Sequence, residues 1–489
     1  MRPSRRPPVR SRNLPVAEAF CIPDRVRHVH FIAICGTAMA AVACMLKELG
    51  YRVTGSDAGV YPPISTFLAE RGIDILEGYD PAHLDERPDL IVIGNAVSRN
   101  NPQVVRAIET GIPCCSMPQA IRRFAVGEKK AIVVCGTHGK TTTSSLIAWM
   151  LCTAGFDPSF IVGGIVEGFG SNYRLGHGEF IVLEGDEYDT AFFDKEAKFL
   201  HYPAYRAVLT GIEYDHADIF SDIGAIRREF SKFLNRMPKN GRVFAFDTGE
   251  HLDAVLAEYT GEVERYGQRE ESSWRLTDLC LDGEETRFSV LHCGRVFGEW
   301  VSPLMGRHNA WNALAAIAVA ESVGVSSETI ASGLRSFPGV RRRQQVRGVV
   351  NGVTVMDDFA HHPTAIRETL QAVRSRFPEA RIIAVFEPGT HTSMRAVFQE
   401  AFPDAFLSAD LVWLRAPTRI AKVPENERIS VERLVTELTG RGKEARLFLD
   451  TQDIVMEAVR TTRPGDLVLV MSNSGFENIH ERLIEALKR

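Results

Sequence analysis

One segment restricts the fold of this 489-residue chain more than any other: Gly136-Thr137-His138-Gly139-Lys140-Thr141-Thr142-Thr143. An apolar run at 131–134, predicted to be a strand, precedes it, and an amphipathic helix predicted over 141–151 follows it. Glycines at such a junction let backbone N–H groups converge on phosphate oxygens, and the helix N-terminus adds partial positive charge. An ordinary strand–turn–helix junction is the alternative. The coincidence of Lys140 and Thr141 with this context favours a nucleotide-binding loop.

This loop is shorter than the usual phosphate-binding loop. Val134 stands where the standard pattern has its first glycine, so the first glycine here is Gly136. In such a loop the lysine contacts the β- and γ-phosphates and the following hydroxyl binds Mg²⁺. We therefore predict these roles for Lys140 and Thr141.

The alternation of apolar strands with helices continues along the chain and predicts an α/β protein with parallel sheets. It fades near residues 124–128 and again near 337–339, which divides the chain into three units. A length of 489 residues also suggests about three domains. We predict a tail over 1–27 and domains over 28–126, 127–336 and 337–489. The predicted strands include 28–34, 52–55, 90–93, 180–183, 207–209, 353–356, 382–386, 411–414 and 467–471; the predicted helices include 307–324 and 364–373.

The composition excludes several classes of function. With 57 Lys+Arg and 62 Asp+Glu, the net charge is −5, which argues against a nucleic-acid partner. No apolar run approaches the ~20 residues of a membrane span. The nine cysteines contain no CxxC pair, which favours reduced thiols and a cytoplasmic protein. The arginine-rich segment 1–23 lacks the apolar stretch of a secretory signal, and no feature defines an oligomeric state.

Acidic residues follow two predicted strands of the central unit. Glu184-Gly185-Asp186-Glu187-Tyr188-Asp189 comes after 180–183, and Asp215-His216-Ala217-Asp218 comes after 207–209. Carboxylates at such strand ends face the crevice where α/β proteins bind ligands and can hold the Mg²⁺ of a nucleotide. Glu184 is therefore a candidate metal ligand. His216 with its neighbouring acids predicts either a second metal site or a surface turn.

A glycine turn opens the first unit. Ile34-Cys35-Gly36-Thr37-Ala38-Met39 follows the first predicted strand, with Asp57 about twenty residues further on. The dinucleotide fingerprint G-x-G-x-x-G is incomplete, because only Gly36 is present. A diphosphate could still bind at this helix N-terminus, and a glycine needed only for a tight turn is the alternative.

Polar motifs also mark the last third of the chain. Asn309 and Asn312 share one face of a predicted helix, where an amide could contact an adenine edge or simply cap and pack. Ser472-Asn473-Ser474-Gly475 follows a predicted strand and suits either a ligand loop or a plain turn. Two further segments carry more charge than a turn requires: Arg341-Arg342-Arg343 and Asp357-Asp358-Phe359-Ala360-His361-His362-Pro363.

Taken in this order, the motifs resemble those of the ATP-dependent Mur ligases of cell-wall synthesis. The resemblance runs from about residue 28 to the C-terminus. It implies a Rossmann-like UDP-binding domain, a central P-loop ATPase domain and a C-terminal Rossmann-like ligase domain. The segments that carry it are 136–142, Glu184, Asp215-His216, His308-Asn309, Arg342-Arg343 and 357–363.

Within the family, the chain is similar to the branch that joins L-alanyl-γ-D-glutamyl-meso-diaminopimelate to UDP-N-acetylmuramate. Segments 55–57, 60–63, 187–195, 215–220 and 357–364 carry this likeness. The alternative is the branch that adds L-alanine to the same nucleotide sugar. Both imply that ATP converts the muramyl carboxylate to an acyl phosphate, which the incoming amine attacks. A nucleotide-binding regulator without turnover and a nicotinamide dehydrogenase are both disfavoured by the intact phosphate loop.

The resemblance also implies the cofactors ATP and Mg²⁺ and a set of site residues. The catalytic residues would be Lys140, Glu184 and His216. The metal ligands would be Thr141, Glu184 and His216. ATP would contact Gly136, Thr137, His138, Gly139, Lys140, Thr141, Thr142, Asn309, Arg343, Asp358 and His361. The UDP-sugar would contact Gly36, Thr37, Ala38, Met39, Ser56, Asp57 and Asn95.

The chain departs from the family pattern at several positions. Thr210 and Gly211 occupy a region where relatives usually have Asn, and Phe230 stands where several members carry a carbamylated lysine. The branches that add alanine or murein peptide also lack that lysine. Arg307 replaces an acid common before the His-Asn pair, and 389–391 reads Gly-Thr-His where relatives have Arg, Ser and Asn. The last departure bears on peptide selectivity.

Overall fold

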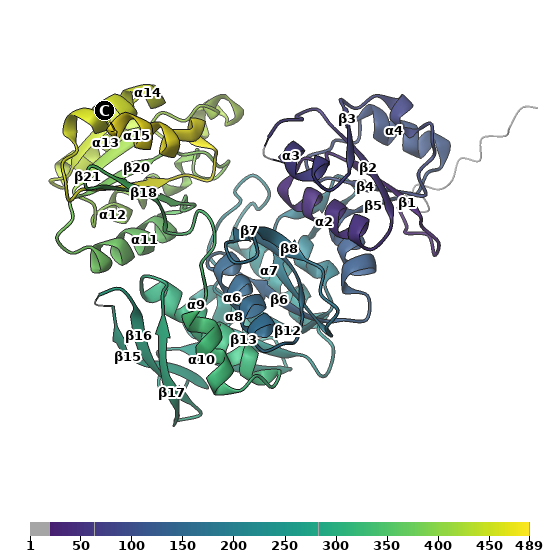
Figure 1. The fold of residues 1–489 in the computed structure, drawn as a ribbon, viewed down its shortest axis with the longest axis horizontal. Coiled ribbons are helices and arrows are strands. Elements are labelled where there is room, and N and C mark those ends of the chain that lie inside the picture. Colours follow the sequence, from purple (N-terminus) through teal and green to yellow (C-terminus); the bar gives the residue numbers. More distant parts are fainter. Residues whose placement is uncertain (1–19, 63, 282, 489) are drawn as a thin grey trace, which may run out of the picture.

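The computed structural model describes residues 20–62, 64–281 and 283–488. The prediction of three α/β domains is confirmed, because three large sheets form three lobes (Figure 1). The lobe of the first sheet and the lobe of the last sheet stand apart, and the central lobe lies between them along the chain. The predicted tail over 1–27 lies mostly outside the described residues.

The first lobe is built on a five-stranded parallel sheet with the order β3-β2-β1-β4-β5. Strand β4 is a continuous, fully buried apolar run, as expected where helices cover both faces of a parallel sheet, whereas β1 and β2 also contain polar residues. The first strand ends at Ile32, not at residue 34 as predicted. The chain turns at Ala33, whose φ is +67°, and Ala33 and Ile34 both donate to the Ser56 carbonyl. The elements are β1 (His28–Ile32), α2 (Thr37–Glu48), β2 (Arg52–Asp57), α3 (Ile64–Ala69), β3 (Asp74–Glu77), η1 (Pro81–Leu84), β4 (Leu90–Ile93), α4 (Pro102–Thr110), β5 (Cys114–Ser116), α5 (Met117–Ala120) and the π-helix η2 (Ile121–Val126).

The central lobe holds a ten-stranded sheet with the order β17-β16-β15-β14-β13-β12-β6-β9-β7-β8. Its middle strands are parallel, and antiparallel strands complete both edges. The alanine-rich helix α9 packs beside α6 on one face, where small side chains allow close approach. The elements are β6 (Lys130–Cys135), α6 (Lys140–Thr153), β7 (Ser159–Val166), β8 (Ser171–Arg174), β9 (Phe180–Gly185), β10 (Asp189–Ala191), β11 (Asp194–Ala197), η3 (Lys198–His201), β12 (Ala204–Leu209), α7 (Ile223–Asn235), β13 (Arg242–Phe246), α8 (Glu250–Leu256), β14 (Glu262–Gly267), β15 (Trp274–Cys280), β16 (Thr286–His292), β17 (Arg295–Ser302), α9 (Arg307–Ser322) and α10 (Ser327–Arg335).

The C-terminal lobe contains a six-stranded sheet with the order β18-β19-β23-β20-β21-β22, parallel except for β18. Pro363 takes the first position of its helix, as predicted, and the His362 side chain caps that helix. The elements are β18 (Gln345–Val350), β19 (Val353–Asp358), α11 (Pro363–Arg376), β20 (Ile382–Phe386), η4 (Ala396–Phe398), α12 (Phe402–Ala405), β21 (Leu411–Arg415), η5 (Ile420–Lys422), η6 (Glu425–Glu427), α13 (Val431–Gly440), β22 (Glu444–Phe448), α14 (Thr451–Thr461), β23 (Leu467–Met471), η7 (Phe476–Asn478) and α15 (Ile479–Leu487).

The first and central lobes share a hydrophobic core, whereas the C-terminal lobe has its own. One buried cluster runs without interruption from strand β1 and helix α2 of the first lobe to helix α8 of the central lobe. At the same interface, Tyr173 Oη donates to Glu48 Oε1 (2.6 Å) and accepts from Arg71 Nε (3.0 Å). The C-terminal sheet has a buried cluster on each face instead. The first two lobes are therefore packed as one unit, and the third has a core of its own.

Among the described residues, no helix is both long enough and apolar enough to cross a membrane.

Candidate active site

The predicted phosphate loop joins β6 to α6, and its two glycines meet steric requirements. Gly136 has φ +130° and Gly139 has φ +79°, a region that favours glycine. A Cβ atom at Gly136 would lie 2.3 Å from Thr210 Oγ1, and one at Gly139 would lie 2.4 Å from Asn312 Oδ1. Both the backbone conformation and the packing behind the loop therefore require glycine.

The segment after β12 forms hydrogen bonds with the backbone of the phosphate loop. The Thr137 amide donates to the Gly211 carbonyl (3.0 Å), and the Thr210 hydroxyl donates to the His138 carbonyl. Thr210 and Gly211 thus hold the loop through one hydroxyl and one backbone carbonyl.

Helix α9 supplies the other support. Thr143 Oγ1 donates to Asn312 Oδ1 (3.2 Å), and Asn312 Nδ2 donates to Asn309 Oδ1 (3.0 Å). Asn309 Nδ2 in turn donates to the Met305 carbonyl (2.8 Å) and to Gln344 Oε1 (3.2 Å). In this structure the predicted adenine contact Asn309 is thus buried in a protein hydrogen-bond network.

Lys140, the predicted phosphate-binding lysine, is buried against an acidic residue. Its Nζ donates to the Gly136 carbonyl (2.7 Å) and lies 2.8 Å from Glu187 Oε2. Burial alone would lower the pKa of Lys140, but the nearby carboxylates of Glu187, Asp186 and Glu184 raise it above its ordinary value. The lysine is charged and held within the loop by Glu187.

Thr141 and Glu184, the predicted ligands of the first metal, lie side by side. Thr141 Oγ1 donates to Glu184 Oε1 (3.1 Å), and Glu184 Oε2 accepts from the Gly163 amide (2.6 Å). Arg343 donates to Thr141 Oγ1 (3.2 Å) from the segment before β18. Burial raises the pKa of Glu184, although Lys140 opposes this shift. Two predicted metal ligands and one predicted ATP contact therefore meet at one point.

His216 contacts the same carboxylate as Lys140, that of Glu187. Its Nε2 is 2.9 Å from Glu187 Oε1, and its buried Nδ1 atom has no hydrogen-bond partner. Burial alone would lower the pKa of His216, but the hydrogen bond with Glu187 and the charge of Asp215 raise it. His216, Asp186 and Glu187 place three ligand atoms within 4.8 Å of one another. These three residues are of the types that can hold a metal ion.

A hydrogen bond from the C-terminal lobe reaches this centre. The Ala217 amide donates to Thr392 Oγ1 (3.2 Å), next to His216. The Asp358 carboxylate is buried and accepts from the Gln344 and Ala360 amides (both 2.8 Å). His361 Nδ1 lies 2.9 Å from the Phe359 carbonyl. Asp358 and His361 thus stand at the entry to α11, where the two lobes meet.

A second group at the same junction combines two histidines with one acid. His138 Nε2 of the loop lies 3.4 Å from Glu213 Oε2, and His362 Nδ1 lies 3.8 Å from the same oxygen. The imidazole rings of His138 and His362 are 4.6 Å apart. Thr364 Oγ1 also donates to Glu213 Oε2 (2.7 Å). Glu213 therefore links the phosphate loop to the first turn of α11.

The predicted UDP-sugar residues lie at the carboxyl ends of β1, β2 and β4. The parallel order places the topological switch between β1 and β4, where open α/β sheets bind ligands. Asp57 Oδ2 accepts from the Cys35 amide (2.8 Å) and Oδ1 from the Gly59 amide (2.9 Å). Gly36, Thr37, Ala38 and Asn95 are exposed there, whereas Met39 and Ser56 are buried.

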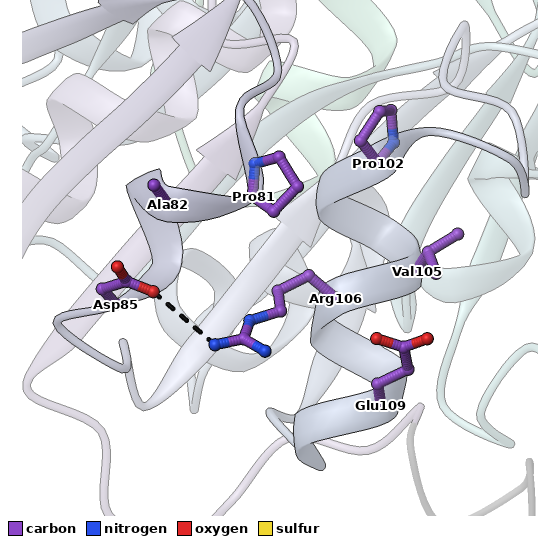
Figure 2. A pocket seen from close by; sticks show the side chains of 7 residues that line it. All are labelled: Pro81, Ala82, Asp85, Pro102, Val105, Arg106 and Glu109. Atoms are coloured by element: carbon purple, nitrogen blue, oxygen red, sulfur yellow. Dashed lines mark ion pairs between the residues drawn. The ribbon is translucent and has the colours of Figure 1, made fainter.

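A surface groove of the first lobe lies between η1 and α4 (Figure 2). Pro81, Pro102 and Val105 give it apolar walls, and Arg106 pairs with Asp85 across it (3.6 Å). None of the predicted site residues lines this groove. The groove is thus separate from the chemical centre.

The sequence favoured Glu184 as a metal ligand over the other acids of its stretch, and it did not predict that Glu187 contacts both Lys140 and His216. Glu187 is 4% exposed, and a charged residue so fully buried beside a phosphate loop needs a charged partner. The sequence shows that Glu187 belongs to an acidic stretch after a predicted strand. It does not show which of the four acids in that stretch contacts Lys140, because this depends on the local backbone. The role of Glu213 depends on contact with a segment about 150 residues away.

Three family models match the chain: "Mur ligase family, catalytic domain" over residues 28–129, "Mur ligase middle domain" over 134–320 and "Mur ligase, glutamate ligase domain" over 341–474. A relative from Escherichia coli (strain K12), named UDP-N-acetylmuramate–L-alanyl-γ-D-glutamyl-meso-2,6-diaminoheptandioate ligase, is 41% identical over 463 residues, covering 94% of this chain and 98% of the relative. A UDP-N-acetylmuramate–L-alanine ligase from Desulforapulum autotrophicum is 35% identical over 464 residues, covering 94% of this chain and 98% of that relative.

Among solved structures, a murein peptide ligase from Psychrobacter arcticus 273-4 is similar, with a TM-score of 0.71 and 33% sequence identity. It covers 95% of this chain and 99% of its own. The family models, the long matching relatives and the three-lobed fold agree. The chain belongs to the Mur ligase family, whose members are ATP-dependent amide ligases.

Proposed function

We propose that this protein joins L-alanyl-γ-D-glutamyl-meso-diaminopimelate to UDP-N-acetylmuramate, with ATP converted to ADP and phosphate. The main support is the buried group of Lys140, Glu184, Glu187 and His216 beside the phosphate loop, which suits phosphoryl transfer to a carboxylate. The choice of amine rests on relatives: the printed name of the 41% identical relative contains this tripeptide, whereas the 35% identical relative is an alanine ligase.

The reaction proceeds in two steps in this proposal. The muramyl carboxylate attacks the γ-phosphate, ADP leaves, and an acyl phosphate forms. The amine of the tripeptide then attacks the acyl carbon, an amide forms, and phosphate leaves. Lys140 contacts the β- and γ-phosphates after nucleotide replaces its contacts with Glu187 and the Gly136 carbonyl. Asp358, His361 and Arg343 contact the nucleotide from the C-terminal side.

The residues present fit Mg²⁺. Thr141 and Glu184 offer two adjacent oxygens, the ligand type that Mg²⁺ prefers. At the second position, His216, Asp186 and Glu187 each offer one ligand atom within 4.8 Å of the other two, and His216 Nδ1 has no hydrogen-bond partner. A bound Mg²⁺ would reduce the repulsion between the substrate carboxylate and the anionic γ-phosphate. We assign Thr141 and Glu184 to the first ion and His216 to the second.

The UDP-sugar contacts in this proposal are the groups at the carboxyl ends of β1, β2 and β4. The exposed N-terminus of α2 at Gly36–Ala38 offers amides to the diphosphate. Asp57 and Asn95 lie on either side of it in the strand order β2-β1-β4. We also propose a cytoplasmic location, because the cysteine pattern favours a reducing compartment.

The test is phosphate release with UDP-N-acetylmuramate, ATP and Mg²⁺ and with one amine at a time. We expect turnover with the tripeptide and little with L-alanine. Turnover with L-alanine alone would place the chain in the alanine-adding branch and refute the proposed amine. Nucleotide binding without phosphate release for either amine would refute the enzymatic assignment itself.

A further inference from the structure

Three side chains at the junction of the central and C-terminal lobes form a group that the proposed reaction does not use as a unit. His138 belongs to the phosphate loop, Glu213 to the segment after β12, and His362 to the N-cap of α11. One ligand atom from each lies within 4.8 Å of the other two. His138 Nε2 is a buried atom without a hydrogen-bond partner, and it lies 3.4 Å from Glu213 Oε2.

The spacing of these atoms suits a transition metal. Zinc binds imidazole nitrogen and carboxylate oxygen at about 2.0–2.2 Å in tetrahedral geometry, which separates neighbouring ligand atoms by about 3.3–3.5 Å. The His138–Glu213 separation of 3.4 Å falls in this range, and the His362–Glu213 separation of 3.8 Å exceeds it by a few tenths. Two imidazoles with one carboxylate select Zn²⁺ or Co²⁺ over Mg²⁺, which prefers oxygen ligands.

We propose that His138, Glu213 and His362 form an interlobe binding site for a divalent transition metal such as Zn²⁺. This site is distinct from the Mg²⁺ positions around Glu184 and His216. Three protein ligands leave a fourth tetrahedral position for water.

Occupation of the site would join the two lobes through three elements. In the structure described, Thr364 links them by donating to Glu213 Oε2 (2.7 Å), and His362 Nε2 lies 3.3 Å from the Tyr214 carbonyl. The metal takes the Nδ1 lone pair of His362, which otherwise accepts from the Thr364 amide (3.2 Å). Because His138 is part of the phosphate loop, metal binding also restrains the loop that must accommodate nucleotide phosphates.

The test uses Co²⁺ as a spectroscopic probe, with the full-length chain free of any histidine tag, nucleotide and Mg²⁺. Tetrahedral Co²⁺ gives a visible absorption band, so a titration measures both geometry and affinity. We expect a one-to-one band that Zn²⁺ displaces. The variants Glu213→Gln and His362→Asn should weaken Co²⁺ binding at least about tenfold. Asparagine can still cap α11, which guards against a loss caused by unfolding alone.

Two controls locate the ion. His177→Gln removes a histidine that is 96% exposed, and binding should stay unchanged. His216→Ala disrupts the other group of potential ligands, and the band should persist. Absence of a tetrahedral band in the wild-type chain, or its persistence in Glu213→Gln and His362→Asn variants with wild-type melting temperatures in EDTA, would overturn the proposal. Loss of the band in His216→Ala would overturn it as well. No substrate is present, so failure here leaves the ligase assignment unaffected.

Discussion

The contact between Lys140 and Glu187 predicts opposite effects of one substitution on nucleotide binding and on turnover. Lys140 Nζ lies 3.1 Å from Oε1 and 2.8 Å from Oε2 of Glu187, and the two side chains are 12% and 4% exposed. Lys140 must leave Glu187 to reach a phosphate. Hydrogen bonds to charged groups contribute about 1.5–3 kcal/mol. Glu187→Gln removes the carboxylate charge and leaves an amide oxygen for His216.

We therefore expect Glu187→Gln to bind ATP about 10- to 150-fold more tightly than the wild type in EDTA, since about 1.4 kcal/mol corresponds to tenfold. With Mg²⁺, the same variant should turn over more slowly, because Glu187 adjoins the second proposed metal position. Isothermal titration calorimetry measures the first effect and phosphate release the second.

The matched control is Glu179→Gln. Glu179 also pairs with a lysine, Lys130, at 2.6 Å, but its side chain is 58% exposed, so ATP binding should not change. Unchanged or weaker ATP binding by Glu187→Gln in EDTA would refute the view that Glu187 competes with nucleotide for Lys140.

Three other substitutions test separate parts of the account. Lys140→Ala should abolish product formation but leave UDP-sugar binding intact by calorimetry; unchanged turnover would refute its assignment to the phosphates. Gly139→Ala should weaken ATP binding at least tenfold, because its Cβ would lie 2.4 Å from Asn312 Oδ1. The control Gly324→Ala, also at positive φ but with open space around the new Cβ, should bind ATP normally. Equal ATP affinities of the two variants would contradict the steric argument. Burial lowers the pKa of His30 to about 3, so below pH 6.5 the unfolded chain binds a proton that the folded chain does not. Acidification should therefore lower the free energy of unfolding by up to about 1.4 kcal/mol per pH unit through this group. In scanning calorimetry between pH 6.5 and 5, His30→Asn should lose stability less steeply than the wild type. Identical slopes for the two proteins would contradict a contribution from His30.

The sequence predicted the fold well because apolar runs in parallel sheets are nearly continuous. The strands Leu90–Ile93, Ile382–Phe386 and Leu467–Met471 occur with the predicted ends. The end of β1 differed because Ala33 turns at positive φ to place two amides on the Ser56 carbonyl, a contact between strands that no local pattern encodes.

Local motifs predicted the parts of the site that lie within one strand–loop–helix unit. Thr141 lies in the first turn of α6, directly after β6 and the phosphate loop, and Glu184 lies near the end of β9. Because β6 and β9 are neighbouring parallel strands, the two side chains come together at the same edge of the sheet. Contacts across larger sequence distances could not be predicted. Asn309 faces Asn312 and Gln344 in this structure, and Thr210 supports the phosphate loop, because the packing of α9 and of the 210–213 segment positions them.

The most direct test of the central claim is a single reaction that contains UDP-N-acetylmuramate, ATP, Mg²⁺ and equal concentrations of L-alanine and L-alanyl-γ-D-glutamyl-meso-diaminopimelate. Mass spectrometry of the products shows which amine has been joined, and phosphate release counts the turnovers. We predict that the UDP-N-acetylmuramyl tripeptide dominates and that one phosphate appears per amide formed. A product that contains alanine alone would contradict the proposed substrate, and amide formation without phosphate release would contradict the acyl-phosphate route.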